Sequence, residues 1–221
     1  MRESLKAALD PKTEVRKRGE QEIRNYRDQD TKKFMATLTR DIADEGLDGA
    51  QRQLACLVLK NFILNQQRNT TYENYWIQLD SELRSQIKLA ILGTLASPVQ
   101  IVRGQVASLI AAIASLEIPR REWDDLLPNL SQNAEHEDFN IRMSSLTTLG
   151  YICEEIQPSD VTDPIKNGLI LALINNMSAN QAEENLSLTR IAARALSYSI
   201  PFASQNFRIQ HERDYIMDRI F

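Results

Sequence analysis

Residues 99–115, VQIVRGQVASLIAAIAS, decide the fold class of this chain. Apolar side chains recur there at Val102, Val106 and Ile110, a spacing that places all three on one face of an α-helix. A helix with an apolar face buries that face against a neighbouring element. The stretch therefore predicts a helix that packs within a larger helical assembly.

The same ladder occurs in four other segments. Its rungs are Val15-Gly19-Ile23, Ala50-Leu54-Val58, Ile141-Ser145-Leu149 and Leu188-Ala192-Leu196. The five ladders start 35, 52, 39 and 47 residues apart, close to the period of two-helix HEAT or armadillo repeats. We therefore predict an all-α fold, an α-α superhelix (solenoid) in which each repeat contacts only its neighbours.

Turn and capping residues divide the chain into repeats. We predict repeats at residues 1–29, 30–66, 67–116, 117–158 and 159–203, followed by the first helix of a sixth repeat within 204–221. A polar loop is expected at residues 66–71, and one continuous helix is expected at 205–221. That last helix ends on apolar residues and has no partner helix, which favours a fragment of a longer array.

Composition limits the partners. Hydrophobic residues make up 43% of the 221 residues, and seven glycines and seven prolines are few for an all-β protein. The net charge is −4, with +4 in the first forty residues and −8 in the remainder. A dominant nucleic-acid binder shows a basic excess, so no direct nucleic-acid partner is expected. A helical repeat that binds RNA or DNA through the first forty residues remains an alternative.

No catalytic or metal-binding pattern is visible. Cys56 and Cys153 lie in apolar helical runs, and His136 and His211 lack neighbouring ligands at metal-site spacing. There is no Gly-rich phosphate loop and no nucleophile elbow. We therefore expect a binding protein without cofactor, metal or enzymatic activity. We also expect no membrane span and no secretory signal, which favours the cytoplasm or nucleus.

Four motifs occur in order along the chain. They are Leu57-Val58-Leu59-Lys60-Asn61 with Trp76, Glu117-Ile118-Pro119 with Trp123 and Leu127-Pro128, Leu149-Gly150-Tyr151-Ile152-Cys153, and Glu212-Arg213 with Tyr215-Ile216-Met217. Together they resemble the importin-β (karyopherin-β) family over essentially the whole chain. The segment at about 12–96 resembles the N-terminal domain of that family.

The resemblance implies a nuclear import receptor that shuttles between cytoplasm and nucleus. Such a receptor crosses the nuclear pore by touching the Phe-Gly (FG) repeats of nucleoporins, and it releases cargo when Ran-GTP binds its N-terminal repeats. It holds the importin-α adaptor through later repeats that this chain lacks. Two alternatives remain open: another karyopherin, importer or exporter, and a HEAT-repeat scaffold unrelated to transport.

Two residues of the first motif are candidates for a partner surface. In the family, the second helices of the repeats meet Ran. Lys60 lies at the rim of its helix's apolar face, from which it could reach Ran. Asn61 points along the same face as Leu54, Leu57 and Val58, which predicts a buried amide with a structural role.

The second candidate site is an apolar slot. Ile170, Leu171 and Ile174 share one helical face. Glu212, Tyr215 and Ile216 share a face of the last helix. In the family the matching positions bind the Phe ring of an FG repeat, although Leu171 stands for a smaller polar residue and Tyr215 stands for Phe. The alternative is simple packing of one helix on the other.

Three further residues are expected to be structural. Trp76 and Trp123 suit packing anchors at repeat junctions. Pro128 falls inside the helical pattern that begins at Trp123, so a kink is expected there.

Overall fold

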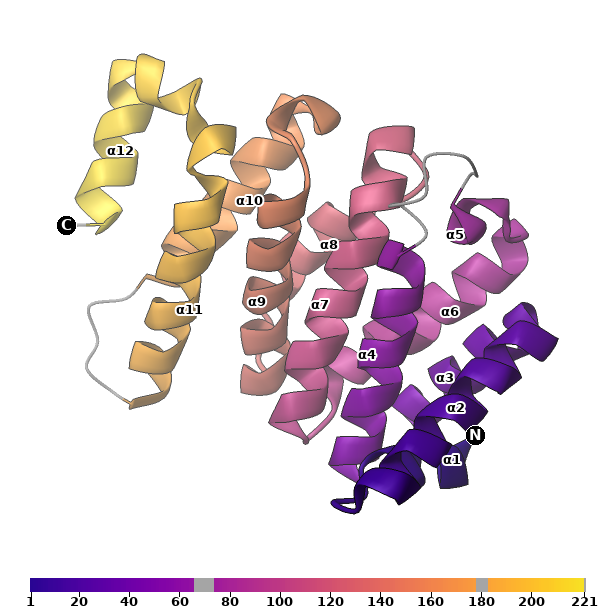
Figure 1. Cartoon of the computed structure of the whole chain (residues 1–221). Helices are drawn as coiled ribbons and strands as arrows, with labels where there is room; N and C mark the ends of the chain where they lie inside the picture. The colour runs from indigo at the N-terminus through magenta and orange to yellow at the C-terminus, as the bar shows by residue number, and fades with distance from the viewer. Residues whose placement is uncertain (66–73, 178–182, 221) are drawn as a thin grey trace. The chain divides into compact units, whose positions relative to one another are not determined.

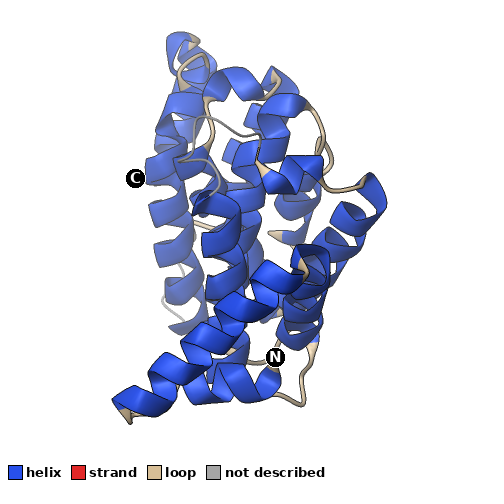
Figure 2. Ribbon diagram, turned by 45° about the vertical axis from the view of Figure 1, so that its right-hand side comes forward, coloured by secondary structure: helices blue, strands red, loops and turns tan. Residues whose placement is uncertain are grey.

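The computed structural model describes residues 1–65, 74–177 and 183–220, and this part of the chain contains helices and turns without strands (Figure 1, Figure 2). The predicted all-α class is confirmed. The chain divides into two compact units, Met1–Ile110 and Ala111–Phe221. The predicted loop at 66–71 and the repeat boundary between 66 and 67 lie outside the described residues.

The first unit is built from paired helices. They are α1 (Arg2–Ala8), α2 (Thr13–Gln29), α3 (Thr31–Ala43), α4 (Gly49–Asn65), α5 (Tyr75–Gln78), α6 (Ser81–Gly93) and the first part of α7 (Gln100–Glu117). α1 packs on α2, α3 packs on α4, and α3 also packs on α6. Asp30 caps α3 by accepting a hydrogen bond from the Lys33 N–H at 2.9 Å, as its position before the helix predicts.

α1 and α2 approach so closely that only glycine fits between them. A Cβ atom at Gly19 would lie 2.4 Å from the backbone nitrogen of Ala8 and 2.7 Å from the carbonyl oxygen of Ser4. Both neighbours are backbone atoms, which cannot rotate away as a flexible side chain can. Gly19 therefore acts as a rung of the first ladder because it lacks a side chain.

α7 is a long and strongly apolar helix. By length and composition the segment Gln100–Arg120 could cross a membrane, but 72% of its apolar window is buried inside the fold. All three rungs of its ladder, Val102, Val106 and Ile110, are fully buried. α7 therefore has the burial of a core helix.

α4 buries a different face from the one that its ladder predicts. Ala50 is exposed and Leu54 and Val58 are half-buried, whereas Cys56 and Leu59 are fully buried. Arg52 lies on this buried face and is itself fully buried. Its guanidinium donates to the Ile42 carbonyl at 2.8 Å, to both carboxylate oxygens of Glu45 at 2.8 and 2.9 Å, and to the Ser97 hydroxyl at 3.1 Å.

The second unit has two layers of helices. Its helices are α8 (Leu126–Asn133), α9 (Phe139–Glu155), α10 (Asp163–Asn175), α11 (Glu183–Ser199) and α12 (Gln210–Ile220). α10 packs against both α8 and α12, and α11 packs against α9 (Figure 1). Short 3-10 segments at Ile200–Ala203 and Asn206–Arg208 connect α11 to α12. The α8, α10 and α12 layer positions the candidate slot.

The predicted kink at Pro128 is absent. α8 begins at Leu126, so Pro128 is its third residue. The first N–H groups of a helix have no acceptor within that helix, so a proline in the first turn removes no hydrogen bond. Trp123 is buried just before this helix, and Trp76 is fully buried in the first unit.

The predicted continuous helix at 205–221 is interrupted. The 3-10 segment Asn206–Arg208 ends at Ile209, whose backbone is extended with φ −96° and ψ 117°, and α12 begins only at Gln210. The Asn206 side chain donates to Asn167 of α10 and to Glu212 of α12 across this break. The break turns α12 into a separate element that packs on α10.

Candidate functional site

All six residues predicted to form the slot come together between α10 and α12. They line an open groove of about 370 Å³ together with Asn167, Asn206 and His211. Ile170, Ile174 and Ile216 are buried and form its floor. Leu171 and Tyr215 form its lip, with 44% and 45% of their surfaces exposed. A groove at the small end of the ligand-site range suits one side chain or a short peptide segment.

One end of this slot is polar. The Asn206 side-chain amide donates to the Glu212 carboxylate at 3.0 Å and to the Asn167 side-chain oxygen at 2.9 Å. The Arg219 guanidinium lies 5.5 Å from the centre of the Tyr215 ring, within the range of a cation–π interaction. The slot therefore combines an apolar floor, an aromatic wall and a carboxylate.

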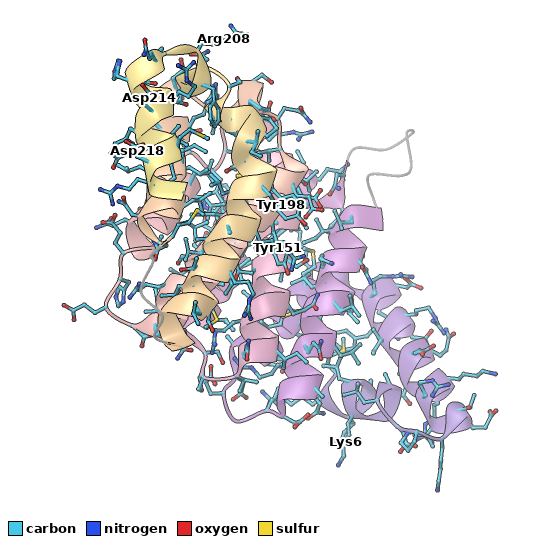
Figure 3. All side chains as sticks on the ribbon, turned by 90° about the vertical axis from the view of Figure 1, so that its left-hand side faces the viewer. Lys6, Tyr151, Tyr198, Arg208, Asp214 and Asp218 are labelled. Carbon is cyan, nitrogen blue, oxygen red and sulfur yellow. The ribbon has the colours of Figure 1, made fainter. Side chains whose placement is uncertain are left out.

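The charged residues Asp214 and Asp218 lie on the outward side of α12 (Figure 3). They do not line the slot. The pattern of α12 therefore separates a charged outer face from the face that carries Glu212, Tyr215 and Ile216.

A second groove lies behind the slot. It has a volume of about 310 Å³ and is lined by residues of α10, α11, α12 and both 3-10 segments, including Met177, Leu196 and Phe207. Ile170 and Ile216 line both grooves. The side chains of these two isoleucines therefore form a wall that the two grooves share.

The candidate Ran residues lie on α4. Lys60 is half-buried, and its ammonium donates to the Ser108 hydroxyl of α7 at 3.1 Å, so it already bridges two helices of the first unit. The prediction of a buried Asn61 is wrong: this residue is exposed, as is Leu57 one turn earlier. The reason is that Arg52 and Cys56, rather than the predicted ladder, set the buried face. The exposed face of α4 therefore offers Leu57 and Asn61, with Lys60 beside them.

A third feature lies between α9 and α11. Tyr151 and Tyr198 lie near each other on these helices (Figure 3) and line a small cleft with Arg194. A hydrogen bond with the Tyr198 side chain is the main cause that raises the pKa of Arg194. Arg194 thus lies in this cleft beside two tyrosines.

Several residues of these sites were not apparent from the sequence. Asn167, Asn206 and His211 line the slot, and Ser108 receives the Lys60 bond. An i,i+3 or i,i+4 pattern finds neighbours on one helix only, whereas these residues act across helices. Only Asn206 has a local sequence signal, because Asn is frequent where helices begin and this residue begins a 3-10 segment. Among the described residues no cluster of His, Cys, Asp or Glu could hold a metal ion.

Comparisons with known proteins agree with this architecture. Residues 20–97 match the family described as the importin-beta N-terminal domain. The chain is 35% identical over 205 residues to importin subunit beta-1 of Arabidopsis thaliana, which covers 92% of the chain and 23% of that relative. It is 32% identical to importin subunit beta-1 of Schizosaccharomyces pombe, covering 97% of the chain and 25% of the relative. The chain thus spans about a quarter of the length of these relatives.

Solved structures of yeast importin-β (Kap95p) have a similar fold over nearly the whole chain. Kap95p in a complex with RanGDP superposes with a TM-score of 0.87 at 27% identity, covering 99% of the chain and 26% of Kap95p. Kap95 in complex with Nup1 superposes with a TM-score of 0.81 at 26% identity, again over 99% of the chain and 26% of the neighbour. The fold is therefore that of the importin-β HEAT-repeat solenoid.

Proposed function

Because the chain is a relative of the importin-β (karyopherin-β) family along its whole length, we propose that it acts as the Ran-GTP-binding and FG-nucleoporin-binding part of a nuclear import receptor. The proposed nucleoporin binding rests on the slot. Three residues of α10 and three residues of α12, about 40 positions later in the sequence, line this one groove. Proteins named importins are transport receptors rather than enzymes, so the proposed activity is recognition without catalysis.

The slot has the physical properties that an FG contact needs. Ile170, Ile174 and Ile216 offer a floor for one aromatic ring, with Leu171 and Tyr215 beside it. Burial of a single ring contributes about 1.5–3 kcal/mol, so each contact is weak. Useful affinity then comes from many repeats acting together. Weak individual contacts suit a receptor that must move through a pore without stopping.

The exposed face of α4 is the proposed Ran contact. Lys60, Leu57 and Asn61 lie together on this helix, and Asn61 is available because it is exposed. The similarity to Kap95p, whose structure with RanGDP is known, supports Ran as the partner. The importin-α adaptor would bind through repeats absent from this chain. The receptor would shuttle between cytoplasm and nucleus and associate with the nuclear pore.

The slot is tested by titrating an FG-repeat peptide against matched variants. Leu171→Asp should weaken binding about tenfold or more, since it places a charge at the lip where the ring enters. Leu186→Asp is the control: Leu186 is 47% exposed on α11 and lies outside the slot. If Leu171→Asp and Leu186→Asp bind like the unchanged chain, the slot is not the FG site.

The Ran part is tested separately. The GTP-locked and GDP forms of Ran are titrated against the chain, and selective binding of the GTP form is expected. Lys60→Ala should reduce that binding several-fold, whereas Leu171→Asp should leave it unchanged. Equal binding of both nucleotide forms would argue against the proposed receptor function.

A further inference from the structure

The polar end of the slot is built from three different elements. Asn167 belongs to α10, Asn206 to the 3-10 segment Asn206–Arg208, and Glu212 to the first turn of α12. The Asn206 amide nitrogen has two hydrogens, and both are used, one for the Asn167 oxygen at 2.9 Å and one for the Glu212 oxygen Oε2 at 3.0 Å. All three side chains line the slot.

This arrangement leaves half of the carboxylate free. Glu212 accepts the Asn206 bond on Oε2, and within the described part of the chain no hydrogen bond is made to Oε1. A lysine or arginine in place of Asn206 would neutralise the carboxylate and could occupy both of its oxygens. A neutral amide holds the group in place and leaves both its charge and one acceptor available.

Asn206 also prevents Glu212 from capping its own helix. Glu212 is the third residue of α12, and a glutamate at that position ordinarily turns back to accept from the N–H of the residue before the helix. Here that residue is Ile209, and its N–H already donates to the Asn206 carbonyl oxygen at 3.2 Å. Backbone and side chain of Asn206 thus both direct the Glu212 carboxylate away from the helix and toward the slot.

We propose that Asn206 is a positioning residue that holds Glu212 so that its Oε1 accepts a backbone N–H from the bound peptide. The inference rests on the proposed FG-binding function and extends it. The slot would then recognise two features of its ligand, an aromatic ring and a free main-chain N–H close to that ring. The ligand class is an extended peptide in which this N–H is present, and a peptide with the N–H blocked is rejected.

The experiment uses an FG-repeat peptide and a series in which each backbone N–H in turn is replaced by N–CH3. With the unchanged chain, methylation at one position next to the Phe should weaken binding about tenfold, the size of a charge-assisted hydrogen bond. Asn206→Ala and Glu212→Ala should each weaken the unmethylated peptide about tenfold and should no longer respond to methylation at that position. The double variant should bind no more weakly than either single variant.

Two controls separate the outcomes. Asn175→Ala removes an exposed amide of α10 that bonds to Glu135 outside the slot, and it should change neither affinity nor the methylation effect. Circular dichroism checks that each variant keeps its helices. If Asn206→Ala retains the methylation effect, or if its loss adds to that of Glu212→Ala, the positioning role is overturned while the proposed function stands. If the unchanged chain binds no FG peptide, the proposed function itself fails.

Discussion

In the first unit, arginine–carboxylate pairs connect helices and turns in addition to the close approach at Gly19, whereas small residues and amides connect the helices of the second unit. In the first unit Arg2 of α1 pairs with Asp41 of α3 at 3.0 Å, and the buried Arg52 bonds to Glu45 and Ser97. These bonds connect segments that are up to 45 residues apart in the chain. Charged groups thus hold the helix ends and turns of the first unit in place.

The second unit, like α1 and α2 of the first, also brings two helices close together at a glycine. A Cβ atom at Gly150 of α9 would lie 3.0 Å from the Ala195 Cβ of α11 and 3.1 Å from its Cα. The buried Asn176 amide donates to the Ala134 carbonyl at 3.0 Å and to the Ala172 carbonyl at 2.9 Å. Neutral hydrogen bonds and close contacts thus connect helices of the second unit.

Each unit contains one cysteine that can report its opening. Burial raises the pKa of both thiols, Cys56 in the first unit and Cys153 in the second, to about 12. A thiol with such a pKa is protonated at pH 8 and unreactive while it stays buried. The rate of labelling by a thiol reagent therefore measures how often each unit opens, separately for the two units.

The largest expected effect is that of Arg52→Ala. It leaves the Ile42 carbonyl without its donor and creates a cavity, so the free energy of unfolding should fall by about 3 kcal/mol. Urea unfolding followed by circular dichroism measures the loss, and labelling of Cys56 should accelerate while that of Cys153 stays unchanged. Arg18→Ala, at an arginine that is 69% exposed, should change stability by less than about 0.5 kcal/mol. Equal acceleration at both cysteines would contradict the separate roles of the units.

A smaller effect is expected for Gly150→Ala. The added methyl group meets the Ala195 backbone, and the resulting strain outweighs the better helix propensity of alanine, for a net loss of about 1 kcal/mol. Here Cys153 should label faster and Cys56 should not. Gly168→Ala is the matched control because a Cβ atom there has nothing within 4 Å. That variant should be slightly more stable; a loss as large as that of Gly150→Ala would show that packing against α11 is not the cause.

The smallest effect concerns pH. The hydrogen bond from Arg52 holds the pKa of Glu45 below its usual value. The stabilisation is therefore fully present above the unfolded pKa of about 4.3 and is lost as the pH falls through the lower folded pKa. Glu45→Gln should flatten the fall in melting temperature below about pH 4.3. Because half of the Glu45 side chain is exposed, the change is modest. If the melting temperature falls with pH equally in the unchanged chain and in Glu45→Gln, the Arg52–Glu45 pair does not contribute to the pH dependence.

Much of the fold follows from the sequence because it depends on local periodicity. The rungs of the α7 ladder are all buried, and the predicted slot residues line one groove. Here the sequence signal and the structural cause are the same, since side chains four residues apart share a helical face. The resemblance to a known family then pairs α10 with α12, which periodicity alone cannot do.

The errors arise where a polar side chain decides the packing. Arg52 is charged, so a pattern of apolar residues assigns it to solvent, yet its partners allow it to be fully buried. The buried face of α4 carries Arg52 together with Cys56, Leu59 and Ile63, and Asn61 lies outside that face. Likewise Asn206, at the start of its 3-10 segment, bonds to Glu212 of the following helix. Such effects depend on partners far away in the sequence, which no local pattern contains.

The two isoleucines shared by the slot and the groove behind it have a thermodynamic consequence. Ile170 and Ile216 line both grooves, so a ligand that fills one groove contacts side chains that also line the other. Any coupling free energy between them is reciprocal: if occupation of the rear groove changes the affinity of the slot by some factor, a ring in the slot changes the affinity of the rear groove by the same factor. A ring in the slot and a group in the second groove would thus both contact Ile170 and Ile216.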